Sequence, residues 1–237
     1  MITADSGASL PELEPLLTRL RAFWFPGGEE AARSVQAVKN KQRGEMRQAP
    51  GSPWIPFTAE ERIETRRSAF CWEARYRGGK LGWISVTDAY AEGHGRLALK
   101  LGGVIPVKKF LGPDFDRGEL QRYLAGLALC PPIVLNHGSL AWAAPAPLTL
   151  RVRDRQDPTG ATVDLEVSTE GCPAGARAER PRMVGNQTIL TPWSAICGEF
   201  REYEGIRFAT RLEVTWHLPE GPFVYFREEV TEFTILR

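Results

Sequence analysis

Four ionisable side chains of this sequence are placed where they could take part in chemistry: Asp88, Glu119, Glu213 and Arg227. Asp88 opens the stretch Asp-Ala-Tyr-Ala-Glu-Gly-His-Gly at the end of an expected strand. A carboxylate there could serve as a general base or as a hydrogen-bond acceptor at the mouth of a cavity. It could also accept hydrogen bonds from the backbone of the following turn, which the two glycines make sharp. The residue types leave both interpretations open.

The other candidates also have a structural explanation. Glu119 stands three residues after Asp116, which is the spacing of a capping box at the N-terminus of a helix. Glu213 and Arg227 fall opposite each other in an expected C-terminal hairpin. They could form a polar pair inside a cavity, but cross-strand ion pairs are equally common on the solvated face of a sheet. A hydrolase or cyclase would need one of these groups to face an enclosed space.

Motifs that would define a nucleotide, cofactor or metal site are absent from the sequence. It contains no G-x-G-x-x-G after a strand, no P-loop, no G-x-S-x-G and no H-E-x-x-H. His94, His137 and His217 are far apart, and nothing in their spacing suggests a metal. The four cysteines are also well separated, which is typical of reduced thiols rather than of a disulfide framework. We therefore expect no cofactor and no metal.

Aromatic side chains give a more specific indication than the ionisable ones. Most of the seven tryptophans lie in or beside the strand-rich part of the chain. Aromatic rings that line a concave sheet can form an apolar ligand cavity, although they can equally fill a core. The candidates for contact with an apolar ligand are Trp72, Trp83, Tyr90, Tyr123, Trp142, Trp216 and Tyr225.

Composition limits the class of partner. The 237 residues include 30 Lys and Arg against 29 Asp and Glu, which gives a formal net charge of +1. That balance creates no long-range field to attract nucleic acid, and no nucleic-acid-binding motif is present. The N-terminus lacks the pattern of a secretory signal, and no stretch approaches about 18 consecutive apolar residues. We expect a soluble cytoplasmic protein with no transmembrane segment and no nucleic-acid partner, while its oligomeric state stays open.

The elements that must position these residues begin with a helix over 14–25, where leucines and aromatic residues recur at helical spacing. A second helix is expected over 117–129, closed by a pair of prolines. We find no internal repeat and no low-complexity linker. The sequence therefore predicts an N-terminal helical segment over residues 1–40 and a single antiparallel β-rich domain over residues 41–237.

A hairpin is predicted around a Gly-Gly dipeptide, which is the pair of residues that a two-residue primed turn favours. If Arg77 lies opposite Lys80, cross-strand pairing places Trp72 and Trp83 on the same, aromatic face. Asp88 then lies on the opposite face of the sheet. A shift of one residue would exchange the faces.

The C-terminal hairpin provides a second register. With Leu218 opposite Pro222, Glu213 falls opposite Arg227, and a second arginine and glutamate pair two residues further on. Further strands are expected over 148–154, 162–167, 178–183, 208–218 and 223–236. The predicted fold class is α+β, mainly β: a curved antiparallel sheet, as a half-barrel or open barrel, wrapped around one or two helices.

Seven stretches carry a resemblance to a bacterial family of unknown function. They are SPWIPFTAEERIE, FCWEARY, DAYAEGHGRL, GELQRYLAGLALCPP, LAWAAPAPLTLRVR, TPW and EVTWHLPEGPFVYFREEV. In this order they resemble the W-x-x-F-x-A-[EQ], D-x-Y-x-x-G-x-G, G-E-L-x-R-Y-L and W-x-L-P-x-G motifs of that family, over about residues 40–237. The family looks like the half-barrel proteins that carry lipids or lipoprotein acyl chains, such as the lipoprotein localisation factors. The resemblance implies a fold and transfers no catalytic residue.

Three classes of function are therefore open. The first is a non-enzymatic protein that binds an apolar small molecule or acyl chain in the concavity of the sheet, against helix 117–129. The second is a small hydrolase or cyclase that uses Asp88 or the Glu213–Arg227 pair. The third is a structural or interaction protein whose core is filled. The lack of any catalytic motif favours the first over the second.

Overall fold

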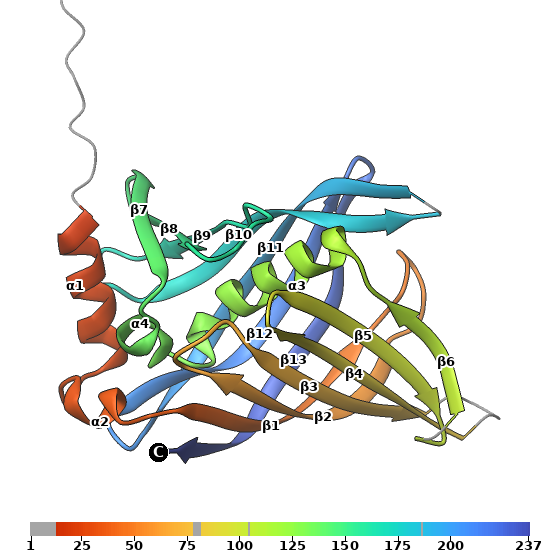
Figure 1. Cartoon of the computed structure of the whole chain (residues 1–237), viewed down its shortest axis with the longest axis horizontal. Coiled ribbons are helices and arrows are strands. Elements are labelled where there is room, and N and C mark those ends of the chain that lie inside the picture. The colour runs from red at the N-terminus through yellow and green to blue at the C-terminus, as the bar shows by residue number, and fades with distance from the viewer. Residues whose placement is uncertain (1–12, 78–81, 104, 186) are drawn as a thin grey trace, which may run out of the picture.

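The protein is built on one antiparallel sheet that curves around a helix (Figure 1). In this computed structural model the described residues are 13–77, 82–103, 105–185 and 187–237. The sheet has thirteen strands and does not close into a barrel, because its first and last strands lie at opposite edges. The predicted fold class, mainly β with a curved open sheet around a helix, is confirmed.

The described part of the chain contains four α-helices, one 3-10 turn and thirteen strands. The helices are α1 (Leu13–Trp24), α2 (Glu30–Arg33), α3 (Pro113–Ala125, extended by the 3-10 turn Gly126–Ala128) and α4 (Ile133–Asn136). The strands are β1 (Ala37–Met46), β2 (Ile55–Glu64), β3 (Phe70–Arg77), β4 (Trp83–Ala91), β5 (His94–Leu101), β6 (Ile105–Phe110), β7 (Leu140–Ala146), β8 (Thr149–Asp154), β9 (Val163–Val167), β10 (Pro173–Val184), β11 (Gln187–Tyr203), β12 (Ile206–Leu218) and β13 (Gly221–Leu236). The predicted first helix and four of the five predicted C-terminal strands agree with α1, β8, β9, β12 and β13 to within a few residues. Strand β10 is longer than expected, and β11 was not predicted.

The strand order explains why a helix crosses the concave face. Across the sheet the order is β6-β5-β4-β3-β2-β1-β13-β12-β11-β10-β9-β8-β7. Strands β6 and β7 follow each other in the chain yet form the two opposite edges. The segment between them must carry the chain from one edge to the other, and its helix α3 contacts β4 and β5 on one side and β9 and β10 on the other. The crossing is therefore a consequence of the topology (Figure 1).

The register of the β3–β4 hairpin differs from the prediction. Arg77 pairs with Trp83, and Trp72 pairs with Asp88. The segment between the two strands is longer than a two-residue turn. Residues 78–81 of this segment lie outside the described residues. The shift from the predicted pairing is an odd number of residues, so the side chains of β4 exchange faces. Asp88 consequently faces inward opposite Trp72, whereas Trp83 points outward and is 57% exposed.

The β12–β13 hairpin confirms the predicted register at its charged pairs. Glu213 lies opposite Arg227, and the next arginine and glutamate along the strands also pair. Closer to the turn, Leu218 pairs with Gly221 instead of the predicted Pro222. The reason is a β-bulge at Tyr225, which shifts the register by one residue. The bulge places Tyr225 beside Trp216 on the inner face, with their ring centroids 5.8 Å apart.

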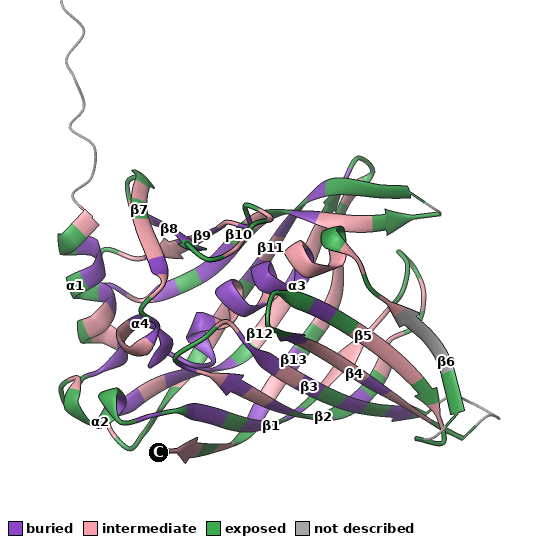
Figure 2. Cartoon of the chain, in the orientation of Figure 1, coloured by how far each residue is buried: buried purple, intermediate pink, exposed green. Residues whose placement is uncertain are grey.

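The hydrophobic core fills the space between α1, α3 and the sheet (Figure 2). Leu20 and Trp24 of α1 are fully buried and belong to the same core as Leu120 and Leu124 of α3. Strand β1 begins at Ala37, ahead of the boundary that the sequence predicts between a helical segment and a β-rich domain. The N-terminal helix thus packs as one wall of the core that the sheet encloses.

Gly44 of β1 is a position where a larger residue has no room. A Cβ there would overlap the backbone oxygen of Arg227 and lie 2.6 Å from the ring of Phe57. We expect Gly44→Ala to lower the free energy of unfolding by about 2–4 kcal/mol, because the backbone of the paired strand cannot move aside. Urea unfolding followed by circular dichroism measures this loss.

The matched control is Gly198→Ala in β11, where nothing lies within 4 Å of the added carbon. This variant should unfold at nearly the same urea concentration as the parent protein. An equal loss in both variants would mean that the close approach of β1 and β13 at Gly44 is not the cause.

Candidate functional site

Charged side chains of α3 and of the inner face of the sheet meet beneath the helix. Glu119 and Arg122 are three residues apart, so they lie on one face of α3. From the sheet come Glu61 of β2, Asp88 of β4 and Glu228 of β13. Glu61, Glu119 and Glu228 are buried, and Asp88 and Arg122 are half-buried. We refer to these five residues as the inner charge cluster.

Within the inner charge cluster, Arg122 is the residue that contacts the largest number of other members. Its Nη1 donates to Asp88 Oδ2, and its Nη2 donates to Glu61 Oε1 at 3.2 Å. Its guanidinium also lies 4.6 Å from the ring centroid of Phe70 and 5.2 Å from that of Trp72. Burial alone would lower the pKa of Arg122, but the carboxylates of Asp88 and Glu61 outweigh it and raise the pKa. The side chain therefore stays a cation and ties α3 to β2, β3 and β4.

A row of amide side chains completes the hydrogen bonding of Glu61. Gln42 Nε2 donates to Glu61 Oε2 at 2.9 Å and to Asn40 Oδ1 at 2.7 Å. The other end of the same amide, Gln42 Oε1, accepts a hydrogen bond from Trp72 Nε1 at 2.7 Å. Burial raises the pKa of Glu61, although Arg122 and the amides act in the opposite direction. Because both carboxyl oxygens have donors, Glu61 can be buried without an unsatisfied polar atom.

Asp88 and Glu119 form a carboxyl pair that holds a proton. An ionised carboxylate only accepts hydrogen bonds, and neither Asp88 Oδ1 nor Glu119 Oε2 finds a donor among the described residues. Burial raises the pKa of Glu119 to about 8; the charge of Asp88 and a hydrogen bond between the two carboxyls act in the same direction. A proton on Glu119 would supply a donor, and the raised pKa of Glu119 favours that proton at neutral pH.

The buried charges of this region balance once the protons are counted. Burial, with the charge of Glu61, also raises the pKa of Glu228 to about 8. Next to the cluster, Arg180 of β10 donates from Nη2 to the backbone oxygen of Gly118 at 2.6 Å and lies 3.8 Å from Glu119 Oε1. With Glu119 and Glu228 neutral, the carboxyls of Asp88 and Glu61 are the ones left to face the two arginines. Such a balance removes most of the cost of burying so many ionisable groups.

The turn after Asp88 is held by a different carboxylate from the one considered in the sequence. The backbone N–H of Gly95 donates to Asp116 Oδ1 at 2.7 Å. Glu92 and Gly93 form the tip of the turn with φ angles of 54° and 83°, the left-handed values that a primed turn requires. Asp88 instead points beneath α3 to Arg122. It therefore does not hold the turn.

The predicted capping box of α3 was wrong. Helix α3 begins at Pro113, after Gly112, so the first turn lies before Asp116. Asp116 is used by the β4–β5 turn, and Glu119 is released to face the sheet. Proline is favoured at the first helical position, and this signal outweighs the capping-box spacing here.

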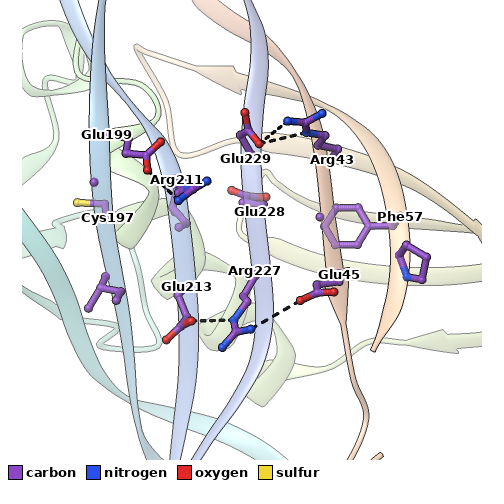
Figure 3. A pocket seen from close by; sticks show the side chains of 15 residues that line it. Arg43, Glu45, Phe57, Cys197, Glu199, Arg211, Glu213, Arg227, Glu228 and Glu229 are labelled. Atoms are coloured by element: carbon purple, nitrogen blue, oxygen red, sulfur yellow. Dashed lines mark hydrogen bonds and ion pairs between the residues drawn. The ribbon is translucent and has the colours of Figure 1, made fainter. Parts of the chain in front are cut away.

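Glu213 and Arg227 lie on the outer face of the sheet. Arg227 Nε donates to Glu213 Oε2 at 2.8 Å, and both side chains are accessible to water. They line a groove of about 810 Å³ across β11, β12, β13 and β1 (Figure 3). Besides Glu228, which belongs to the inner charge cluster, the other charged residues that line this groove are Arg43, Glu45, Glu199, Arg211 and Glu229. The arginines and glutamates of the outer face form ion pairs across neighbouring strands. Such pairs are typical of the solvated face of a sheet.

The seven aromatic candidates divide by position. Trp72, Tyr90 and Tyr123 are buried. Trp142, Trp216 and Tyr225 are half-buried on the inner face. Trp83 lies on the outer face. Tyr123 donates from its hydroxyl to the backbone oxygen of Glu64 at 3.0 Å. Burial raises the pKa of Tyr90 to about 12, so it stays a neutral core residue. The half-buried group is the one that a ligand in the concavity could touch.

Part of the inner face is not covered by α3. Large apolar side chains of the inner face are only half-buried there, although they pack against the core. They are Met46, Ile55, Ile84, Leu99, Trp216, Tyr225 and Phe226. We refer to these seven residues as the inner apolar surface.

A second polar cluster, which the sequence did not reveal, lies where α4 meets the end of β8. Ser68 Oγ and Ser139 Oγ each donate at 2.7 Å to one oxygen of Asp154. They also lie 3.1 Å and 3.2 Å from the two ring nitrogens of His137, whose pKa is lowered by burial. The carboxylate contacts the serines and lies 3.9 Å from the imidazole, so it does not orient the ring as a nucleophilic relay requires. The spacing gave no signal because the four residues come from three separate parts of the chain.

The described residues offer no group of three or more His, Cys, Asp or Glu side chains placed to hold a metal ion. All four cysteines are free thiols. Among the helices that the structure describes, none has both the length and the apolar character needed to cross a bilayer.

The curved sheet with a helix across its concavity is a LolA-like fold. A LolA superfamily protein from Nitrosomonas europaea matches with a TM-score of 0.50 and 12% identity, over 95% of this chain and 94% of that one. A DUF1329 family protein from Desulfovibrio piger matches with a TM-score of 0.50 and 8% identity, over 93% and 90%. A domain assigned to outer membrane lipoprotein sorting, from Vibrio parahaemolyticus, matches with a TM-score of 0.50 and 7% identity, over 89% and 90%. At these identities the similarity concerns the fold alone.

The family follows from the sequence itself. The model of DUF6920, a family of unknown function, matches residues 16–234. Because the match spans nearly the whole chain, the protein belongs to the DUF6920 family. No curated protein matches closely enough to count as a relative. The resemblance to an uncharacterised family with a half-barrel fold of the lipoprotein-localisation type is confirmed.

Arg122→Met should show how strongly α3 depends on the inner charge cluster. We expect the free energy of unfolding to fall by about 3–5 kcal/mol, because the buried carboxylates of Asp88 and Glu61 lose their cation. As a control, Arg211→Met removes an arginine of the outer face, whose pair with Glu199 is exposed to water. That change should cost less than about 1 kcal/mol. Similar losses in urea for both variants would refute a special role for Arg122.

Stability should also depend on the proton of Glu119. The pKa of Glu119 in the folded protein is about 8, above the ordinary value of 4.5, so the folded state binds this proton more tightly than the unfolded state. This contribution to stability is complete below the ordinary pKa and is lost as the pH rises through about 8. Each such carboxyl lowers the free energy of unfolding by about 1.4 kcal/mol per pH unit between those limits.

Urea unfolding at a series of pH values measures this slope. Glu119→Gln keeps a neutral side chain at every pH and should flatten the decline, leaving the contribution of Glu228 in the same direction. Glu73→Gln on the exposed face of β3 should leave the decline as it is. A decline that Glu119→Gln does not change would show that the shared proton is absent.

Proposed function

We propose that the protein binds an apolar molecule with an acyl chain on the inner apolar surface of its curved sheet. The observation that carries the proposal is that seven large apolar side chains of the concave face are only half-buried. Apolar area that stays accessible to water is unfavourable, and on a concave face it is suited to an apolar ligand. A ligand that lay along the concavity would cover it.

The chemical make-up of the inner apolar surface suits a flexible, apolar ligand. The rings of Trp216 and Tyr225 stack with centroids 5.8 Å apart, and Phe226 stacks on Phe57 at 5.2 Å. Met46 adds a flexible thioether at the edge of this aromatic group. Aromatic faces and methionine adapt to ligands of different shape, and neither requires a polar group in return. The nearest charged groups of the inner face are already paired within the inner charge cluster.

The similarity of fold supports the same class of ligand. One of the similar structures is assigned to the sorting of lipoproteins, whose acyl chains are apolar. A shared fold does not fix a function, so this similarity adds to the argument from the inner apolar surface and does not replace it. The hypothesis of an enzyme gains no comparable support, because Asp88 is paired beneath α3 and the Glu213–Arg227 pair lies on the outer face.

Titration of the full chain with a fluorescent fatty acid tests the proposal. We expect saturable binding, weakened about tenfold or more by Leu99→Gln and by Phe226→Gln, because each puts a polar amide where the acyl chain would lie. Ile196→Gln changes an exposed apolar residue of the outer face and should leave the affinity unchanged. Native mass spectrometry of protein purified from cells would show a lipid that remains bound.

Circular dichroism and thermal unfolding establish that each variant is folded before its affinity is compared. If the parent protein binds no fatty acid or lysophospholipid and yields no lipid by mass spectrometry, the proposal fails, and a structural protein with a filled core is the better account. Loss of affinity in the Ile196 variant to the same extent would place the binding elsewhere on the molecule.

A further inference from the structure

One end of the long axis of the molecule combines exposed apolar side chains with positive charge. The β10–β11 hairpin projects at this end, and the ends of β3, β4, β5 and β6 reach the same end on the other side of the molecule (Figure 1). These parts of the chain belong to residues 77–86, 99–111 and 181–190. We refer to the residues of these three segments that the structure describes as the open rim.

The β10–β11 hairpin is apolar on both of its faces. Its exposed apolar side chains are 42–56% accessible to water: Met183, Val184, Ile189 and Leu190. Cross-strand pairing places Met183 and Leu190 on one face and Val184 and Ile189 on the other. A groove on a partner protein covers one face of such a hairpin, whereas a lipid phase surrounds it. The two-sided pattern therefore favours a lipid.

The opposite side of the open rim carries a tryptophan and an isoleucine. Trp83 is 57% exposed and Ile105 is 59% exposed. The guanidinium of Arg77 lies 5.9 Å from the ring of Trp83. Tryptophan and arginine side by side are favoured at the level of lipid headgroups, where one side is apolar and the other is wet.

The charge of the open rim selects the kind of lipid. The described residues of the three segments include five Lys and Arg and no Asp or Glu. The remainder of the chain has 25 Lys and Arg against 29 Asp and Glu. The formal net charge of +1 thus conceals a positive end and an acidic remainder. Arg77, Lys100 and Arg182 are members of the rim whose side chains reach water. A surface of this kind is complementary to anionic headgroups.

We propose that the open rim docks on an anionic lipid surface, with the tip of the β10–β11 hairpin between the headgroups. This docking goes beyond the proposed ligand binding, and the two are measured separately, so either can fail while the other holds. Docked in this way, this end of the sheet, with the inner apolar surface, would face the lipid.

Flotation of the full chain with vesicles tests the docking. We expect the protein to bind vesicles of about 30% phosphatidylglycerol in phosphatidylcholine, to bind pure phosphatidylcholine far less, and to lose binding as salt increases. The double variant Met183→Ser/Ile189→Ser should bind the anionic vesicles about tenfold or more weakly, because two apolar groups no longer enter the headgroup layer. Lys100→Glu should weaken the binding at least about fivefold.

Matched controls lie at the opposite end of the long axis. Tyr203 ends β11 there and is 42% exposed, and Lys39 is an exposed lysine near the start of β1 (Figure 1). Tyr203→Ser and Lys39→Glu should leave vesicle binding unchanged, and all variants should keep their affinity for fatty acid and their circular dichroism spectrum.

Three results would overturn the docking proposal. The first is no binding of the parent protein to anionic vesicles, and the second is an equal loss in the Tyr203 and Lys39 variants. The third comes from sedimentation velocity: a dimer that the Met183→Ser/Ile189→Ser change dissociates would mean that the hairpin pairs with a second copy of the chain. Failure of fatty-acid binding alongside intact vesicle binding would refute the proposed function and leave the docking standing.

Discussion

The buried guanidinium of Arg122 is the interaction on which the interior of this protein depends. Carboxyls from three strands and from α3 face one another inside the curved sheet, and an interior without a cation would have to protonate or expel them. Arg122 lies between two of them, and protons neutralise two others. The position of α3 is consequently fixed by charge as well as by apolar packing, since sliding the helix by one residue would separate the guanidinium from its carboxylates.

The inner charge cluster also divides the concave face into two regions with different properties. On one side of it, α1 and α3 press against the sheet and the apolar side chains are fully buried. On the other side, the sheet continues beyond the helix and the inner apolar surface remains partly exposed. A filled core and an unfilled apolar surface thus coexist in one sheet. The first supplies the stability that permits the second to stay uncovered.

Alternation and charge pairing made much of this fold predictable from the sequence. The curved sheet, the first helix and the Glu213–Arg227 pairing all follow from local patterns. The predicted face of Trp83 was wrong, because it depended on the length of the β3–β4 turn, which the local sequence pattern does not determine. The bulge at Tyr225 has no signature in the sequence, since two-residue alternation continues on either side of it. The partners of Arg122 could not be predicted, because Asp88 and Glu61 come from strands that are distant from it in the sequence.

The pairing of β1 with β13 has a consequence for how the chain folds. The strands nearest the two ends of the chain lie together in the middle of the sheet, where Ala37 is paired with Leu236, while the sheet edges come from the middle of the chain. The strands β1–β6 and β7–β13 are each joined by short, local connections and can form early. Pairing β1 with β13 requires closure of a loop that contains nearly the whole sequence. The entropy lost in closing so long a loop makes this step slow. During synthesis, the first meander must therefore wait with an unpaired edge until the final strand leaves the ribosome.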